Sequence, residues 1–148
     1  MPTALTRRRA LDAQEETWQV MYGDVEAGAI ARRIGNPAGT SPWQWFCGFY
    51  PGSHPGEQTA GAAETFDDAR AAFEQAWAAF LAKRTPEDFA AYRRDRAFRA
   101  WKYAMWDARC TMPTQATSGR SRCFCGTAID LTTTSQHIYS CHMALAAR

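Results

Sequence analysis

The residues whose types and spacing indicate chemistry lie near the C-terminal end of the 148-residue chain. Cys123 and Cys125 are separated by a single residue, and His137 follows twelve positions after Cys125. Cys141 and His142 come four and five positions after His137. This spacing is close to that of small zinc fingers, in which Zn²⁺ accepts four thiolate or imidazole ligands tetrahedrally. The pattern predicts a zinc site.

The fourth ligand of this site is either Cys141 or His142. A helix would place His137 and Cys141 on one face, while the longer spacing to His142 is one that zinc fingers also tolerate. The single residue between the first two cysteines departs from the usual two to four, and the competing interpretation is unpaired thiols with surface histidines. We favour the metal because so short a segment has little core, and bound zinc contributes roughly 10–16 kcal/mol to folding. Four protein ligands predict a closed, structural site.

A second candidate site precedes the cysteines, where cations and aromatic rings are interleaved. The cations nominated to bind nucleic acid are Arg93, Arg94, Arg96, Arg99 and Lys102, with Arg120 and Arg122 beside the cysteines. Among them lie the rings of Tyr92, Phe98, Trp101, Tyr103 and Trp106. Such a face can contact phosphates while its rings stack on bases; the competing interpretation is that the long cationic side chains only cover the rings.

The charge distribution favours this half of the chain as the place for an anionic partner. Residues 86–148 carry nine Lys or Arg against five Asp or Glu, whereas residues 1–85 carry eight against ten. The net charge of the whole chain is only +2. DNA or RNA should therefore prefer the second half, and a protein partner is the alternative.

The elements that must position these residues are predicted from hydrophobic periodicity. After a polar lead-in at 1–16, residues 17–84 form a β-β-β-α domain with strands near 17–22, 28–34 and 43–50. Thr65 is a good N-cap for a helix whose apolar stripe comprises Phe66, Ala69, Phe73, Ala76, Trp77 and Phe80. The predicted fold class is α+β, with a three-stranded antiparallel sheet packed on a helix.

The second half contains the basic–aromatic helix at 85–110, a linker at 111–121 and a small zinc-finger-like module at 122–148. Thr85 supplies an N-cap and Pro86 the first helical position. Residues 51–62 are rich in Pro and Gly and predict a loop, of a length at which function becomes worth considering.

Several classes of protein find no support in the sequence. No stretch of 18 apolar residues predicts a membrane span, and acidic residues follow Arg7, Arg8 and Arg9 where a secretory signal needs an apolar core. We therefore expect a cytoplasmic protein, in which five cysteines favour metal binding over disulfides. There is no phosphate-binding Gly-rich loop, serine elbow or His-Glu metalloprotease pair.

Two stretches resemble small alphaproteobacterial proteins that have no established activity. The first combines a tryptophan-bearing strand with a G-x-A-x-T-x-x-x-A helix start, here Gly28, Ile30, Trp43, Trp45, Gly61, Ala63, Thr65, Ala69, Phe73, Ala76 and Trp77. The second is a Cys-x-Cys-Gly tail, here Cys123, Cys125, Gly126, Ile129, Asp130, His137 and His142. The resemblance implies two closing histidines, which favours His142 as the fourth ligand.

These observations favour a non-enzymatic, zinc-containing nucleic-acid-binding or regulatory protein. The first alternative is a protein–protein adaptor, self-associating or partner-binding, that uses the exposed aromatics of residues 92–106. A small metalloenzyme with an open metal site is the second alternative.

Overall fold

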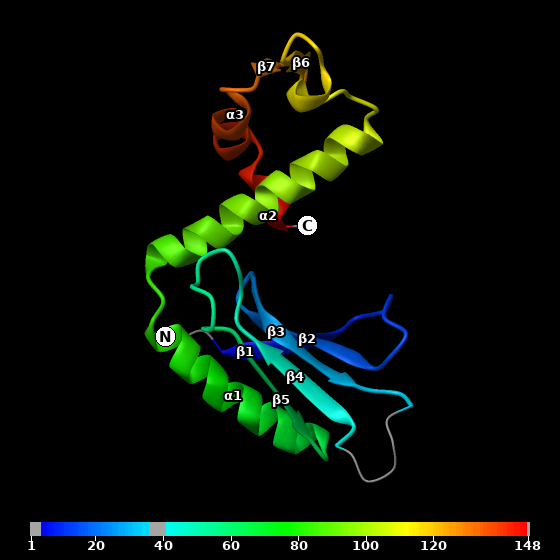
Figure 1. Cartoon of the computed structure of the whole chain (residues 1–148), viewed down its shortest axis with the longest axis vertical. Coiled ribbons are helices and arrows are strands. Elements are labelled where there is room, and N and C mark those ends of the chain that lie inside the picture. Colours follow the sequence, from blue (N-terminus) through cyan, green and yellow to red (C-terminus); the bar gives the residue numbers. More distant parts are fainter. Residues whose placement is uncertain (1–3, 36–40, 148) are drawn as a thin grey trace. The chain divides into compact units, whose positions relative to one another are not determined.

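The computed structural model describes residues 4–35 and 41–147, and the chain divides into two compact units (Figure 1). Unit 1 is Met1–Phe89 and unit 2 is Ala90–Arg148. The predicted α+β class is confirmed, since an antiparallel sheet and helices occur together. Each unit is described by itself below.

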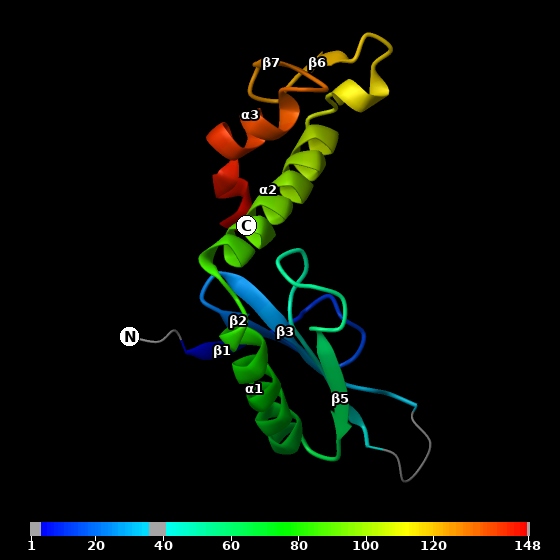
Figure 2. The same cartoon turned by 60° about the vertical axis from the view of Figure 1, so that its left-hand side comes forward.

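Unit 1 is a five-stranded antiparallel sheet with one helix packed on it. The strands are β1 (Leu5–Arg9), β2 (Thr17–Tyr22), β3 (Val25–Arg32), β4 (Trp43–Cys47) and β5 (Thr59–Ala63), and their order in the sheet is their order in the chain. The helix α1 (Phe66–Ala82) packs against β3, β4 and β5 and runs along one face of the sheet (Figure 2).

The prediction of three strands was incomplete, because both edge strands have sequences that do not look like strands. β1 reads Leu-Thr-Arg-Arg-Arg, and its Arg7 guanidinium lies 4.8 Å from the Trp18 ring and 4.6 Å from the Phe66 ring. Charged residues are common on exposed edges, where they discourage further strand pairing. β5 begins inside the expected loop at 51–62 and consists of small residues; the indole of Trp45 fills the space beside Gly61.

Helix α1 begins and packs as its sequence indicates. The Thr65 hydroxyl accepts a hydrogen bond from the Asp68 N–H at 3.1 Å, so the predicted N-cap is confirmed. The stripe of Ala69, Phe73, Trp77 and Phe80 is buried. Aromatic contacts dominate this core, with the Phe80 ring 5.4 Å from Trp77 and 5.1 Å from Phe49.

Residues 51–58, between β4 and β5, are fastened to the chain that follows α1. Arg84 donates hydrogen bonds to the Gly52 carbonyl and to the Glu57 carboxylate, and its own side chain is only 3% exposed. The Glu57 carboxylate also accepts from the His54 N–H at 2.6 Å. This loop is therefore held by a buried cation.

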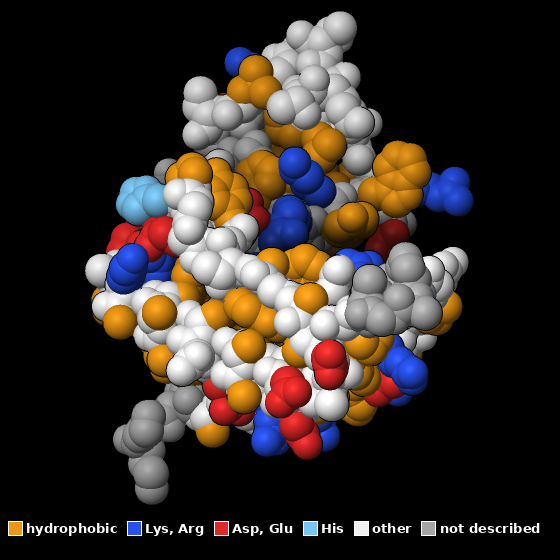
Figure 3. All heavy atoms as spheres, turned by 60° about the horizontal axis from the view of Figure 1, so that its bottom comes forward, with side chains coloured by type: hydrophobic (Ala, Val, Ile, Leu, Met, Phe, Trp, Pro, Cys, Tyr) orange, Lys and Arg blue, Asp and Glu red, His pale blue; other side chains and the backbone are white. Residues whose placement is uncertain are grey.

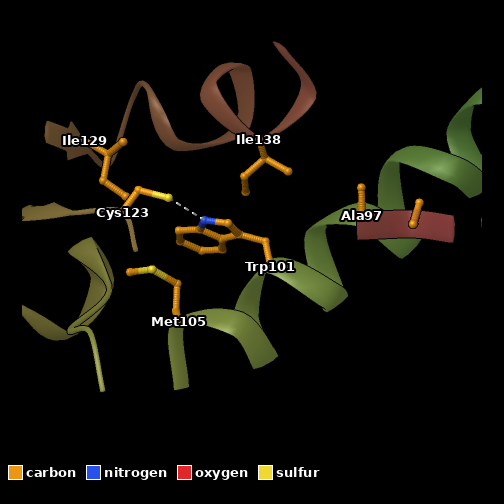
Figure 4. Packing of buried hydrophobic residues seen from close by; sticks show 7 residues of the cluster. Ala97, Trp101, Met105, Cys123, Ile129 and Ile138 are labelled. Atoms are coloured by element: carbon orange, nitrogen blue, oxygen red, sulfur yellow. Dashed lines mark hydrogen bonds between the residues drawn. The ribbon is translucent and has the colours of Figure 1, made fainter. Parts of the chain in front are cut away.

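Unit 2 consists of a long helix and a short, mixed segment that folds against it. The elements are α2 (Pro86–Asp107), of which the part from residue 90 onward belongs to this unit, then η1 (Pro113–Gln115), β6 (Arg120–Arg122), β7 (Ala128–Asp130), α3 (Thr134–Cys141) and η2 (Met143–Ala147). Thr85 and Asp88 exchange hydrogen bonds at the start of α2, as in a capping box. The core of unit 2 joins one face of α2 to the C-terminal segment. It consists of Ala97, Trp101, Met105, Cys123, Ile129, Ile138 and Ala146 (Figure 4).

Among the described residues, none of the helices combines the length and the apolar character that crossing a membrane requires.

Candidate metal centre

Four side chains of unit 2 converge as a possible metal centre. The ligand atoms of Cys123, Cys125, His137 and His142 all lie within 4.8 Å of one another. Cys141, the other candidate for the fourth position, is exposed and is not part of this group. The structure thus brings together two thiols and two imidazoles that can hold a metal ion.

Three of the distances within the group are close to those of ligands around a tetrahedral ion. The Cys123 Sγ lies 3.3 Å from the His142 Nε2, and the Cys125 Sγ lies 3.4 Å from the His137 Nε2. The two Nε2 atoms are 3.2 Å apart. Zn–S and Zn–N bonds of ordinary length at tetrahedral angles place ligand atoms about 3.3–3.8 Å apart, so these side chains need little movement to reach one ion.

The two cysteines are presented by a tight turn between β6 and β7. The Gly126 N–H donates to the Cys123 carbonyl at 2.8 Å, and the Cys123 N–H donates to the Thr127 carbonyl at 2.9 Å. Gly126 has a φ of 96°, which glycine adopts without a steric cost. The intervening Phe124 turns its ring onto His142, with 4.8 Å between ring centroids. A single residue between the cysteines is therefore enough for both sulfurs to face the same point.

The two histidines are presented by the end of α3. His137 lies inside the helix, whereas His142 is its C-cap, with φ −128° and its N–H donating to the Ile138 carbonyl at 2.7 Å. Because the backbone has left the helical path at His142, a spacing of five can bring its ring back to His137. A regular helix would have favoured Cys141, so helical geometry alone selects a residue that lies outside this group.

An aspartate fixes where α3 begins. The Asp130 carboxylate accepts hydrogen bonds from the N–H groups of Thr132 and Thr133 at 2.8 and 3.0 Å. Together with the Thr132 hydroxyl, these donors lower the pKa of Asp130 below its ordinary value. The turn at 130–133 thereby sets the register of the helix that carries His137.

The two sulfur atoms lie in different surroundings. Cys123 is 2% exposed and accepts a hydrogen bond from the Trp101 Nε1–H at 3.3 Å (Figure 4). Burial raises the pKa of the Cys123 thiol. Cys125 is exposed, and hydrogen bonds with the side chain and backbone of Thr127 lower its pKa to about 6. A metal ion would supply the charge that favours a thiolate at Cys123.

The nominated cations do not all lie on one open face. Arg93, Arg94 and Arg96 are half-buried, and each has interactions within the protein. Arg99 and Lys102 are exposed; Arg99 Nε lies 2.9 Å from an Asp95 oxygen, an exposed pair of small energetic value.

The remaining cations and rings separate by burial. Arg120 and Arg122 are exposed on β6, and Arg122 donates to the Gly126 carbonyl at 3.0 Å. Trp101 is 1% exposed, while Tyr103 and Trp106 are 72% and 78% exposed. The aromatic residues of α2 therefore serve two purposes: some build the core and two face outward.

The sequence did not predict the unusual backbone conformation of Arg109, which lies just after α2. It is exposed and has a φ of 57°, the left-handed region where glycine is usual. An arginine carries no sequence signal for that conformation.

No protein-family model, curated protein or solved structure matches this chain.

Proposed function

We propose that the protein is a non-enzymatic, zinc-containing nucleic-acid-binding protein, whose unit 2 contacts a single strand through the exposed face of α2. The observation that carries this proposal is the exposure of Tyr103 and Trp106, at 72% and 78%, beside exposed cations of the same helix. Zinc is the metal that the ligand set favours, since two thiolates and two imidazoles in a tetrahedral arrangement match its preferences.

The zinc-finger-like arrangement of residues 120–142 supports a structural role for that metal. The turn of a short hairpin carries the cysteines, α3 carries His137, and His142 is the C-cap of that helix. Four protein ligands leave no position at the metal for a water molecule, so the metal would stabilise the fold and would not take part in catalysis. A small metalloenzyme consequently has the least support of the three functions considered.

The proposed contact surface follows from spacing along α2. Residues three and four apart are neighbours on a helix, so Arg99, Lys102, Tyr103 and Trp106 form one continuous strip. We call these four residues the α2 strip. Exposed rings contribute little to folding, whereas each ring that stacks on a base contributes about 1–3 kcal/mol to binding.

The distribution of charge also favours unit 2 as the part that binds nucleic acid. Residues 90–148 carry nine Lys or Arg against three Asp or Glu, whereas residues 1–89 carry eight against twelve. In Figure 3, acidic and basic side chains are interspersed on the face of unit 1 that comes forward. An anionic strand should therefore prefer unit 2.

A titration of the zinc-loaded protein with a labelled single strand of about 12 nucleotides tests the proposal, because that length lies within the site sizes usual for such proteins. We expect fluorescence anisotropy to show binding that weakens between about 50 and about 200 mM salt. Trp106→Ala should weaken binding by about tenfold, the loss of one stacked base. Arg70→Ala, an exposed cation of unit 1, is the matched control and should bind as the wild type does. Absence of binding at low salt, or binding without a salt slope, would contradict the proposal.

The second candidate function is a protein–protein adaptor, and the exposure of Leu131 at 62% favours it. Cations beside the rings favour nucleic acid instead. If the titration fails, light scattering should show a dimer, or a defined protein partner should be captured. The substitution Trp106→Ala should then abolish the dimer or the capture.

A further inference from the structure

The end of α2 has an unusual residue at the position that stops the helix. The Arg109 N–H donates to the Trp106 carbonyl at 3.0 Å, and the Cys110 N–H reaches back to the Met105 carbonyl at 2.9 Å. These bonds close the helix around Arg109 in the left-handed conformation. Glycine is the usual residue there, because any residue with a Cβ is less stable in that region.

Among the residues that the structure describes, no contact of the side chain accounts for an arginine at this position. Over residues 4–35 and 41–147, no hydrogen bond, ion pair or ring contact involves the Arg109 side chain. The side chain is exposed. Because no side-chain contact among the described residues offsets this conformational cost, Arg109 points to a partner outside the chain.

Arg109 lines a hollow whose walls suit a nucleotide. The hollow measures about 410 Å³ and is lined by Trp106, Arg109, Cys110, Thr111 and Gln115. This is within the size of small-molecule sites. The Gln115 Oε1 accepts from the Met112 N–H at 3.1 Å, which leaves its amide nitrogen as the donor for a ligand. The site thus combines a flat ring, a cation and polar groups from two side chains.

We propose that this hollow holds one unpaired nucleotide, with its base stacked on Trp106 and its phosphate paired with Arg109. Thr111 and Gln115 then face the edge of the base, where a carbonyl oxygen or ring nitrogen can accept a hydrogen bond. The inference rests on the proposed function, because Trp106 also belongs to the α2 strip and the nucleotide is part of the same strand. It adds Arg109, which lies just beyond the α2 strip, as the residue that makes a defined phosphate contact.

The test uses two substitutions that separate folding from binding. Arg109→Gly relieves the backbone and should raise the thermal midpoint of the zinc-loaded protein by about 3 °C. The same change removes a charge-assisted contact and should weaken single-strand binding by about tenfold. The salt slope should fall by about 0.7, the value for one phosphate on a single strand. Arg109→Lys keeps the charge and should retain the wild-type slope without the gain in thermal midpoint.

A competition experiment at constant ionic strength separates a nucleotide site from a phosphate site. Uridine monophosphate should displace the labelled strand at lower concentration than inorganic phosphate does, because only the nucleotide also stacks. Equal competition would overturn the base contact.

The outcomes also separate this inference from the proposed function. If the wild type binds the strand and Arg109→Gly binds equally well, the nucleotide site is wrong and the α2 strip stands. If the wild type does not bind at all, both are wrong. If Arg109→Gly binds the strand more weakly and has a higher thermal midpoint, the nucleotide site is supported, because damage to the fold would lower both the affinity and the thermal midpoint.

Discussion

At the candidate metal centre, a tryptophan of the core contacts one of the four candidate ligands directly. The Trp101 Nε1–H donates to the Cys123 sulfur, and Trp101 is only 1% exposed. Hydrogen bonds to metal ligands orient those ligands and adjust their basicity. The ring of Trp101 therefore links the packing of α2 to the strength of the centre.

Trp101→Phe should weaken zinc binding by about 10–100-fold, the range usual for loss of a residue that supports a ligand. The substitution keeps an aromatic ring in the core and removes the N–H donor. Competition with a chromophoric chelator measures the affinity, and Trp106→Phe, the same change at an exposed position of α2, is the control. Equal affinities for the two variants would show that the hydrogen bond has no role.

Cys141→Ser should leave metal stoichiometry at one equivalent, because the Cys141 sulfur lies outside the group of four ligands. His142→Ala and Cys125→Ser should each retain only a small fraction of an equivalent after gel filtration, because each removes a ligand. Metal analysis of the three purified variants measures this. Loss of the metal in Cys141→Ser with retention in His142→Ala would reverse the assignment.

Residue type and spacing predicted the group of four side chains that could hold a metal ion, but helical geometry alone did not select His142 over Cys141. Helical spacing favours Cys141, and only the departure of the backbone at His142 reverses that preference. Nor does any residue pattern reveal that Trp101 is buried while Tyr103 and Trp106 are exposed, because all three alternate with cations. Burial there depends on which side of α2 the C-terminal segment covers.

Among the elements, those with strong periodicity were predicted and those without it were not. α1 has an apolar stripe and an N-cap, and both are present as expected. β1 and β5 lack apolar alternation; they are strands because β2 and β4 offer them backbone partners. Pairing with a neighbour is a tertiary effect that a local pattern does not contain.

The loop at 51–58 was also predicted only in part. Its Pro and Gly residues indicated an irregular segment, but they did not reveal that Arg84 holds this segment in place. The His54 N–H and the Arg84 guanidinium lower the pKa of the Glu57 carboxyl. The folded state thus binds this proton less tightly than the unfolded chain. The stabilisation is present above the ordinary glutamate pKa of about 4.3 and is lost as pH falls through the lower folded value.

Glu57→Gln should therefore flatten the acid limb of the stability curve. We expect the free energy of unfolding of the wild type to fall more steeply below about pH 4.3 than that of the variant. Denaturant unfolding at a series of pH values measures the difference, with Glu64→Gln, an exposed carboxylate of unit 1, as the control. If the free energy of unfolding falls equally steeply at low pH for the wild type and Glu57→Gln, the Glu57 carboxylate does not stabilise the loop as proposed.

For the molecule as a whole, the main feature is that each unit has its own core. The core of unit 1 is formed by the sheet and α1, and that of unit 2 by α2 and the segment that carries the candidate metal ligands. The α+β class and the difference in charge between the halves were predictable from composition and periodicity. The resemblance to small alphaproteobacterial proteins stays a prediction.

Removal of the metal should unfold residues 120–142 of unit 2 and spare unit 1. Loss of zinc removes roughly 10 kcal/mol of folding free energy from a small zinc-stabilised segment, so amide exchange at residues 120–142 should approach the rate of an unfolded chain. Amides of β2, β3 and β4 should keep their protection. Hydrogen-exchange mass spectrometry with and without a strong chelator measures both. Retained protection at residues 120–142 after complete metal removal would show that this segment does not depend on the ion.

The unequal burial of the two sulfur ligands has a kinetic consequence. A competing chelator or a thiol-reactive reagent meets the exposed Cys125 well before the covered Cys123. Bonds to the ion should therefore open in a fixed sequence, outer sulfur before inner. Transfer of the metal to an acceptor would proceed by stepwise ligand replacement from the solvent side, at a rate governed by access to a single atom.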